Sequence, residues 1–275
     1  MLFLGLDGGG TGCRAALADL NGTVIARAEG GPANIASDPD RARDNILSTL
    51  MATLRAAGAE PVGLCLGLGL AGANMAGASA RLAAGLPFSR LRIETDAVAA
   101  ALGALGGADG IVAAIGTGSV FAVVEGGHVR QIGGWGFVLG DEGSGAVIGR
   151  AILSAALRAD DGHLAMTPLL DRLLREHGGP AGIVAFAQTA RPADFGRLAP
   201  DVLASPDPAA LAVMTAAAAE VASSIDLLQA GRALPVVFTG GLGPTYLARL
   251  AGRWVTRDAV GTALDGALML ARGLL

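Results

Sequence analysis

The 275-residue chain contains no lysine, so arginine supplies every positively charged side chain. This absence excludes a Walker-A P-loop, in which a lysine contacts the β- and γ-phosphates. It also excludes any mechanism that forms a Schiff base on lysine. If the protein binds a phosphate group, then backbone N–H groups, hydroxyl groups and a metal ion must supply most of the attraction.

Aromatic residues and net charge are also low. Aromatic side chains make up 4% of the residues, and the formal net charge is −4. A nucleic-acid-binding surface needs basic grooves and stacking rings, so we expect no nucleic-acid partner. The histidines have no cysteine or histidine neighbours at the spacing of zinc ligands, which argues against a zinc site.

Cysteines and long apolar runs are few. Cys13 and Cys65 are far apart and form no CxxC pair, which favours free thiols in a reducing compartment. Asp7 interrupts the opening apolar run, which is too short for a signal-peptide core. Residues 97–124 carry Asp109 as their one charge, but their glycines and hydroxyl groups indicate a helix and a hairpin rather than a membrane span. We expect a cytoplasmic protein with no membrane partner.

A glycine hairpin occurs twice. The first copy, LFLGLDGGGTGCRAAL, runs from Leu2 to Leu17, and the second, IVAAIGTGSVFAVV, runs from Ile111 to Val124. Each copy reads as a strand, a glycine turn and a second strand, and a third short strand follows. Glycine lets the backbone approach an anion closely, and successive N–H groups form an anion-binding concavity. One such turn means little, but a duplicated one predicts a polyphosphate held by two hairpins.

The elements expected around each hairpin define two domains of similar order. The first domain reads as βββαβαβα, with strands at 2–7, 13–18, 23–28, 62–70 and 91–96 and helices at 39–57, after 74 and at 97–105. The second begins with its own three strands, followed by helices at 145–158, 166–176 and 208–229, a strand at 235–239, and helices after 244 and 258. We expect irregular structure between Pro192 and Pro208. We expect domains at 1–108 and 109–258, with the last helix (259–275) packing on the first domain.

Three carboxylates carry the candidate chemistry. Asp7 ends a buried strand beside the first glycine turn, where it could cap the hairpin or position Mg²⁺. Asp96 ends another strand, where it could cap the next helix or act as a general base. Asp141 lies in a glycine-rich loop before a helix, where it could favour the helix N-terminus or bind a ligand. Trp135 in the same loop could be a core residue or a ligand-facing ring.

Together these segments resemble the actin-like and sugar-kinase superfamily. The resemblance rests on LDGGGTG, IETDAVAA, IGTGS, GGWGFVLGDEGSG and FTGGL, which span most of the chain. The GGWGFVLGDEGSG string, from Gly133 to Gly145, is the most specific. It is similar to the branch that contains N-acetylglucosamine kinase, bacterial glucosamine kinase and the BadF/BadG/BcrA/BcrD-type ATPases that activate acyl-CoA reductases and dehydratases. The implied fold is α/β, with two ribonuclease-H-like domains and a nucleotide and sugar cleft between them.

The resemblance also implies roles for individual residues. It implies that ATP and Mg²⁺ are used, that Asp7 positions the Mg²⁺ through water, and that Asp96 takes the proton from the acceptor hydroxyl. The implied ATP- and phosphate-binding residues are Gly9, Gly10, Thr11, Gly116, Thr117, Gly118, Ser119, Gly240 and Gly241. The implied sugar-binding residues are Asn34, Asp96, Gly134, Trp135 and Asp141. A direct phosphate contact from Arg14 is left open, and a homodimer is expected.

The function expected from the resemblance is a kinase that phosphorylates the 6-hydroxyl of an amino sugar, with N-acetylglucosamine first. Glucosamine is the alternative acceptor, and muramic-type sugars stay open. A different class is the ATPase activator of an acyl-CoA dehydratase or reductase, which needs cysteine thiolates for an iron–sulfur cluster. Cys13 and Cys65 both lie on expected strands, which disfavours the activator.

Overall fold

A computed structural model describes residues 1–275, and they form two compact units. The first unit comprises Met1–Val112, Ala122–Gln131 and Asp258–Leu275. The second unit comprises Ala113–Phe121 and Ile132–Arg257.

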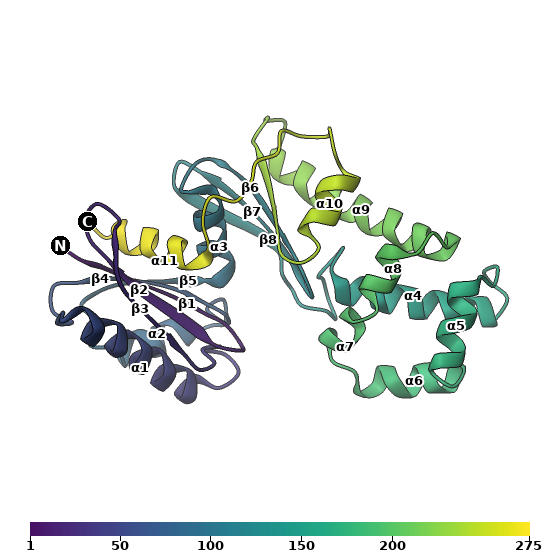
Figure 1. The fold of residues 1–275 in the computed structure, drawn as a ribbon, viewed down its shortest axis with the longest axis horizontal. Coiled ribbons are helices and arrows are strands. Elements are labelled where there is room, and N and C mark those ends of the chain that lie inside the picture. The colour runs from purple at the N-terminus through teal and green to yellow at the C-terminus, as the bar shows by residue number, and fades with distance from the viewer. The chain divides into compact units, whose positions relative to one another are not determined.

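The first unit has the predicted element order βββαβαβα (Figure 1). Its elements are β1 (Phe3–Gly8), β2 (Cys13–Ala18), β3 (Val24–Gly30), α1 (Pro39–Ala57), β4 (Cys65–Leu70), α2 (Ala78–Ala84), β5 (Arg90–Thr95) and α3 (Asp96–Leu105). They form a five-stranded sheet of order β3-β2-β1-β4-β5, in which β1, β4 and β5 are parallel. Asp38 caps α1, because its side chain accepts a hydrogen bond from the Arg41 N–H.

Alternate side chains along β1 point to opposite faces of this sheet, and a helix packs on each face. Leu4 and Leu6 join a core cluster with Ile46 and Leu50 of α1. Phe3 faces the other way and packs with helix α11 (Ala263–Arg272) at the end of the chain. Helix α11 also packs against α3 and β4. Apolar side chains are therefore buried on both faces, as a parallel sheet requires.

Two glycines let α11 lie directly on the sheet backbone. Gly5 of β1 and Gly67 of β4 are partners in the strand register and share the α11 face. A Cβ atom on Gly67 would overlap the Ala267 carbonyl oxygen and the Ala271 nitrogen. A Cβ atom on Gly5 would overlap the Leu268 nitrogen. The backbone of α11 therefore takes the space that side chains occupy in most sheets.

The second sheet repeats the topology of the first. Its strands are β6 (Gly110–Ile115), β7 (Ser119–Glu125), β8 (His128–Gly133) and β9 (Val236–Thr239), in the order β8-β7-β6-β9. A single parallel bridge joins Val236 to Thr256. Thr256 follows β9 and α10 in the chain, just as β5 follows β4 and α2 in the first sheet. The counterpart of β5 is therefore reduced to one residue pair.

The expectation of irregular structure between Pro192 and Pro208 was wrong. The segment forms α7 (Pro192–Gly196) and α8 (Ala199–Ala204), and an unpredicted helix α6 (Pro180–Thr189) precedes them. Each of these helices has a proline in its first turn, where the missing N–H group breaks no helical hydrogen bond. The other helices of this unit are α4 (Gly145–Asp160), α5 (Pro168–Glu176), α9 (Pro208–Gln229) and α10 (Gly243–Arg249).

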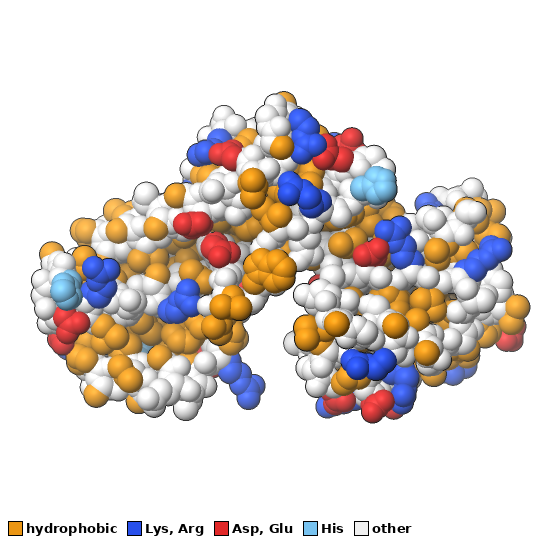
Figure 2. Space-filling model, turned by 180° about the vertical axis from the view of Figure 1, so that it is seen from behind, with side chains coloured by type: hydrophobic (Ala, Val, Ile, Leu, Met, Phe, Trp, Pro, Cys, Tyr) orange, Lys and Arg blue, Asp and Glu red, His pale blue; other side chains and the backbone are white.

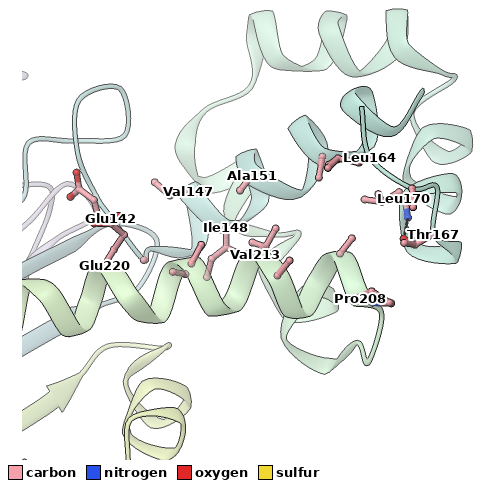
Figure 3. A pocket seen from close by; sticks show the side chains of 17 residues that line it. Glu142, Val147, Ile148, Ala151, Leu164, Thr167, Leu170, Pro208, Val213 and Glu220 are labelled. Carbon is pink, nitrogen blue, oxygen red and sulfur yellow. Dashed lines mark hydrogen bonds between the residues drawn. The ribbon is translucent and has the colours of Figure 1, made fainter. Parts of the chain in front are cut away.

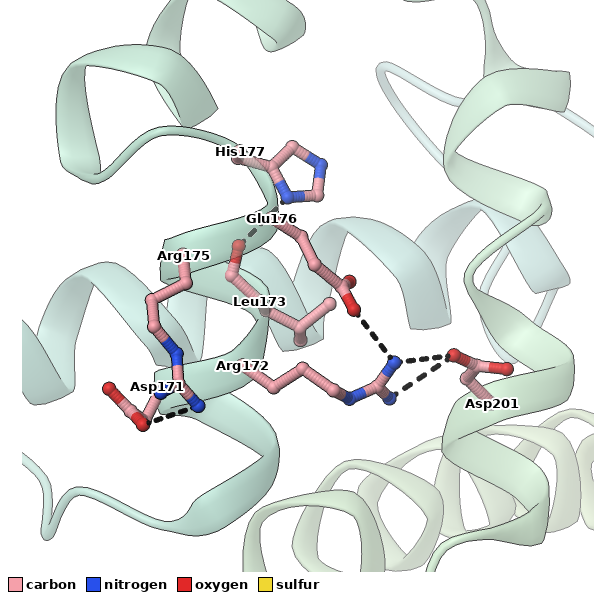
Figure 4. A network of polar contacts seen from close by, with 7 residues as sticks. All are labelled: Asp171, Arg172, Leu173, Arg175, Glu176, His177 and Asp201. Atoms are coloured by element: carbon pink, nitrogen blue, oxygen red, sulfur yellow. Dashed lines mark hydrogen bonds and ion pairs between the residues drawn. The ribbon is translucent and has the colours of Figure 1, made fainter.

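Polar contacts link α5 to α8 (Figure 4). The Arg172 guanidinium lies 3.1 Å from an Asp201 carboxylate oxygen and 3.2 Å from a Glu176 carboxylate oxygen. All three side chains are about half exposed, so these pairs add little to the stability of the fold. Acidic and basic side chains are similarly interspersed over the face shown in Figure 2.

Residues 97–124, which have few charges, form α3, β6 and β7, as expected of a helix followed by a hairpin. By length and composition, α9 is the one helix in the chain that could cross a membrane. Its exposed positions include Leu211 and Leu227, which lie among small and polar residues.

We predict that Gly67→Ala destabilises the protein by about 1–3 kcal/mol, because the added methyl group must push α11 away from β4. Gly273→Ala is the matched control. Gly273 follows α11 at a φ of −66°, and its added methyl would meet only ordinary contacts, so we expect a change within about 0.5 kcal/mol. Urea unfolding of both variants measures the difference. Equal midpoints would contradict close packing of α11 on the sheet.

Candidate active site

The carboxyl ends of the parallel strands in the first unit meet at one edge of the sheet. Gly8 of β1 pairs with Leu70 of β4, and Leu70 pairs with Thr95 of β5. The first glycine loop (Gly9–Gly12), the loop after β4 and Asp96 therefore all follow strand ends at this edge. Ligands of open α/β sheets bind beyond the carboxyl ends of the strands.

The first glycine loop is open to a ligand. Its turn is closed by a 2.9 Å hydrogen bond from the Gly9 N–H to the Gly12 carbonyl. A Cβ atom on Gly9 or Gly10 would meet nothing within 4 Å, and Thr11 is exposed. Packing inside the protein therefore does not explain the glycines here, whereas close approach of an anion does.

Asp7 lies beside this loop and is paired with Arg14. The two residues are partners across β1 and β2, and Arg14 Nη2 lies 2.9 Å from Asp7 Oδ2. The Asp7 side chain is 15% exposed and that of Arg14 is 57% exposed. Arg14 is thus near the glycine loop, but the contact that the structure shows is with the carboxylate.

Asp96 is not the N-cap of the helix that it begins. Thr95 is the cap, because its hydroxyl oxygen accepts a 3.2 Å hydrogen bond from the Val98 N–H. Asp96 is the first residue of α3, and its Oδ1 accepts a 2.9 Å hydrogen bond from the Ala97 N–H. The Thr95 hydroxyl also lies 3.3 Å from Gln131 Oε1. Capping therefore does not account for an aspartate at position 96.

The pKa of Asp96 is raised above the ordinary aspartate value. The main cause is that surrounding atoms displace water from the carboxylate, although the residue keeps an exposed outer face. The Ala97 N–H opposes the shift, and the negative charge of Asp7 adds to it. The two carboxylates are thus close enough to interact, and a raised pKa makes Asp96 a stronger base.

Asn34 is held in a loop that contacts the first glycine loop. Its Oδ1 accepts hydrogen bonds from the N–H groups of Ala36 (3.0 Å) and Ser37 (3.1 Å). The neighbouring Ala33 N–H donates to the Gly9 carbonyl at 2.8 Å. Asn34 therefore lies near Gly9, with its side-chain oxygen already used.

The second glycine loop (Gly116–Ser119) is exposed at one residue and held by hydrogen bonds at another. Thr117 is exposed, but Ser119 is buried. The Ser119 hydroxyl donates a 2.7 Å hydrogen bond to the Glu142 carbonyl. The Ser119 N–H donates to Asp141 Oδ1 at 3.4 Å. This hairpin is therefore attached to a segment that we call the carboxylate loop (Asp141–Gly145).

Asp141 is buried in a left-handed conformation, with a φ of 61°, which is uncommon for a residue other than glycine. Its carboxylate lies against Gly118 as well as the Ser119 N–H. Upstream, Trp135 is 71% exposed, so it is not a core residue. Gly134 precedes it at a φ of 70°.

A third glycine loop (Gly240–Gly243) follows β9. Gly240 has a φ of 80° and lies against the Ile115 backbone, so no larger residue fits there. A Cβ atom on Gly241 would meet nothing within 4 Å, and Gly241 lies close to Gly116 of the second glycine loop. The second and third glycine loops are therefore neighbours, and each has an open surface.

Sequence reasoning missed Tyr246 of α10. It is the only tyrosine of the chain and is fully buried, and its hydroxyl donates a hydrogen bond to the Gly143 carbonyl. Burial raises its pKa well above the ordinary tyrosine value. A buried tyrosine needs a partner for its hydroxyl, and its rarity in this chain was the one available signal.

The second unit also contains a cavity of about 640 Å³ between α4 and α9 (Figure 3). Its lining is apolar except for Glu142, Thr167 and Glu220. A sugar needs many hydrogen-bonding groups, so this lining does not suit one. The candidate site residues thus fall into two sets, around Asp7 and Asp96 in the first unit and around the second and third glycine loops in the second unit.

Comparison with known proteins confirms the family resemblance and the two-domain sugar-kinase fold. The sequence matches the BadF/BadG/BcrA/BcrD ATPase family over residues 4–257. The glucosamine kinase GspK of Vibrio cholerae is 31% identical, with 98% of this chain and 95% of that protein aligned. An N-acetylmuramic acid/N-acetylglucosamine kinase of Clostridium acetobutylicum is 29% identical over 58% of this chain and 54% of its own.

A solved structure from Chromobacterium violaceum, described provisionally as an N-acetylglucosamine kinase, is 34% identical. It superposes with a TM-score of 0.80 and covers 98% of both chains.

We predict that the Asp96 carboxyl titrates above 3.8, the ordinary aspartate value, and that Asp7→Asn lowers this pKa. Removal of a nearby negative charge favours the ionised form of Asp96, so the shift is downward. Carboxyl carbon-13 NMR of aspartate-labelled protein measures both values. Asp40→Asn, which removes an exposed carboxylate from α1, should leave the titration unchanged. An unchanged Asp96 pKa in Asp7→Asn would show that the two carboxylates do not interact.

Proposed function

Since this chain belongs to the BadF/BadG/BcrA/BcrD ATPase family and is an ATP-dependent amino-sugar kinase, we propose that it phosphorylates the 6-hydroxyl of N-acetylglucosamine. Glucosamine is the alternative acceptor, which the similarity to the Vibrio cholerae enzyme favours. The observation that carries the proposal is Asp96, which starts α3 without capping it, has a raised pKa and interacts with Asp7.

In the proposed reaction Asp96 orients the acceptor hydroxyl and takes its proton. The hydroxyl oxygen then bonds to the γ-phosphorus of ATP, the bond from that phosphorus to the β–γ bridging oxygen breaks, and ADP leaves. Phosphoryl transfer depends mainly on positioning and on electrostatic stabilisation of the phosphate oxygens. A base beside the acceptor hydroxyl would position the nucleophile. N–H groups around the phosphates would stabilise the charge on the phosphate oxygens.

The glycine loops supply the nucleotide contacts in this proposal. Without lysine, backbone N–H groups, hydroxyl groups and a metal ion must supply most of the attraction to the phosphates. Gly9, Gly10 and Gly241 have open space where a side chain would otherwise lie. We assign phosphate and nucleotide contacts to the same residues as the sequence analysis: Gly9, Gly10, Thr11, Gly116, Thr117, Gly118, Ser119, Gly240 and Gly241. Ser119 would contribute its backbone, because its hydroxyl is bonded to Glu142.

The residues around Asp7 fit a magnesium ion that is held partly by phosphate. No group of three or more His, Cys, Asp or Glu side chains lies close enough to hold a metal alone. Mg²⁺ usually keeps several waters and binds through one or two carboxylates together with substrate phosphates. Asp7 supplies one carboxylate next to an open glycine loop. When bound, the ion would neutralise charge on the phosphates.

Acceptor recognition is assigned to Asn34, Gly134, Trp135 and Asp141 together with Asp96. The Asn34 side-chain nitrogen is available to a hydroxyl, because the loop hydrogen bonds use only its oxygen. Trp135 exposes most of its ring, as a sugar-stacking side chain must.

The homodimer and the cytoplasmic location stay predictions. The exposed leucines of α9 are compatible with the first, and the buried, unpaired Cys13 and Cys65 with the second.

We predict that ADP release depends on an amino sugar. The assay couples ADP formation to a spectrophotometric signal over N-acetylglucosamine, glucosamine, N-acetylmannosamine, N-acetylmuramic acid and glucose. The highest kcat/KM should belong to N-acetylglucosamine. A higher value for glucosamine would select the alternative acceptor. ATP hydrolysis that no sugar stimulates would contradict the kinase and favour the ATPase activator.

We predict that Asp96→Asn lowers kcat by about 10²–10⁴-fold, because asparagine keeps the shape but cannot accept the proton. Sugar and ATP affinities should change much less, since the amide can still contact the hydroxyl. Glu94→Gln is the matched control: it removes a carboxylate from the adjacent strand, where Glu94 pairs with Arg92 at 2.9 Å, and should leave kcat near wild type. A near-normal kcat in Asp96→Asn would contradict its role as the base.

A further inference from the structure

Hydrogen bonds join the carboxylate loop to the second glycine loop. The Gly145 N–H donates to the Gly116 carbonyl at 2.8 Å, and the Ala146 N–H donates to the Thr117 carbonyl at 3.2 Å. The two bonds from Ser119, to Asp141 and to the Glu142 carbonyl, add to these. A change in the position of either loop must therefore break several hydrogen bonds or move the other loop with it.

Tyr246 joins the same carboxylate loop to the third glycine loop. Helix α10 begins at Gly243, the last residue of the third glycine loop, and presents Tyr246 about one turn later. Its hydroxyl donates to the Gly143 carbonyl. The Leu242 N–H, also in the third glycine loop, donates to the Ile115 carbonyl at 3.0 Å, immediately before the second glycine loop. The three loops of the second unit thus form one hydrogen-bonded body.

The part of this body that most needs support is Asp141. A left-handed conformation costs a residue with a side chain more than it costs glycine, so the surroundings must impose it. Ser119 fixes the loop at Asp141 and Glu142. On the other side, Gly143 lies against Val221 of α9, and its carbonyl is directed at Tyr246. Loss of the Tyr246 hydroxyl would leave that carbonyl buried without its partner.

We propose that Tyr246 is a positioning residue that holds Asp141 in its acceptor-binding conformation and couples that conformation to the third glycine loop. The inference rests on the proposed function, in which Asp141 contacts the sugar and the third glycine loop contacts the nucleotide. Tyr246 touches neither substrate. Its effect passes through one hydrogen bond to Gly143, two residues beyond Asp141. A tyrosine that merely fills the core would support all of the second unit equally and would not discriminate between the substrates.

The kinetic test is Tyr246→Phe, which removes one oxygen and keeps the ring. The expected result is a sugar KM raised about five- to tenfold, with the ATP KM changed less than about twofold, because the loss of a buried hydrogen bond loosens the Asp141 side of the body. Calorimetry should also show that a non-hydrolysable ATP analogue strengthens sugar binding less in the variant than in the wild type. An equal rise in both KM values, or no rise in either, would overturn the proposal.

Thr167→Val is the matched control for general loss of stability. It also removes one hydroxyl from the second unit, where Thr167 caps α5 far along the chain from the three loops. The control should lower the melting temperature without changing the sugar KM. If Thr167→Val raises the sugar KM as much as Tyr246→Phe does, the effect is one of stability and the proposal is wrong.

Hydrogen exchange tests the same inference without any substrate. The N–H groups of Ser144 and Gly145 should exchange about tenfold faster in Tyr246→Phe, while those of α5 should not change. Unchanged exchange in the carboxylate loop would overturn the proposal whatever the acceptor is. Faster exchange in a protein whose ATP turnover no sugar stimulates would support the positioning role while showing that the proposed function fails.

Discussion

The register of the parallel strands β1, β4 and β5 is the constraint on which the first unit depends. Pairing Gly8 with Leu70 and Leu70 with Thr95 brings three strand ends to one edge, so that Asp7 and Asp96 interact although they are far apart in sequence. A shift of one residue in either pairing would turn alternate side chains to the other face of the sheet. In the pairing of β1 with β4, such a shift would take Gly5 and Gly67 out of register, so that only one of them could face α11, whose backbone needs the space that both leave. The packing of α11 therefore requires this strand register, and the register is in turn stabilised by that packing.

The absence of lysine affects how the proposed phosphate site is built. A lysine-based phosphate site can use one flexible charged side chain, whereas a backbone-based site needs loops whose N–H groups are held in place. The second unit holds its loops with short-range hydrogen bonds from Ser119, Gly145 and Tyr246. Buried hydrogen bonds of this kind are strong because the surrounding dielectric constant is low. An ion pair on the surface, in contrast, is screened by water and contributes little. In the proposed phosphate site, N–H groups held in this way need no rearrangement when charge develops on the phosphate.

Motifs with strong local signals were predictable from the sequence. The first βββαβαβα order and the limits of α9 both follow from periodicity and from proline at the first helical turn. Helices α7 and α8 were missed because the prolines between Pro192 and Pro208 were interpreted as a sign of irregular structure, although proline is compatible with the first turn of a helix. Side-chain partners such as the Tyr246–Gly143 contact join residues far apart in sequence, and no local pattern records them.

The two glycine hairpins differ in which part of the chain supplies the carboxylate beside each turn. When GGTGC and IGTGS are aligned on Gly-Thr-Gly, Asp7 corresponds to Ala113, so the second hairpin has no carboxylate on its own strand. It acquires one from Asp141, which is buried and directed at the Ser119 N–H. Asp7, by contrast, is 15% exposed and paired with Arg14, whose side chain is 57% exposed. Asp141 is thus bonded to the backbone of the second hairpin, whereas Asp7 is bonded to a side chain of its own hairpin. The two hairpins thus share their glycine turns, while the carboxylate beside each comes from a different part of the chain: the first strand supplies Asp7, and the carboxylate loop supplies Asp141.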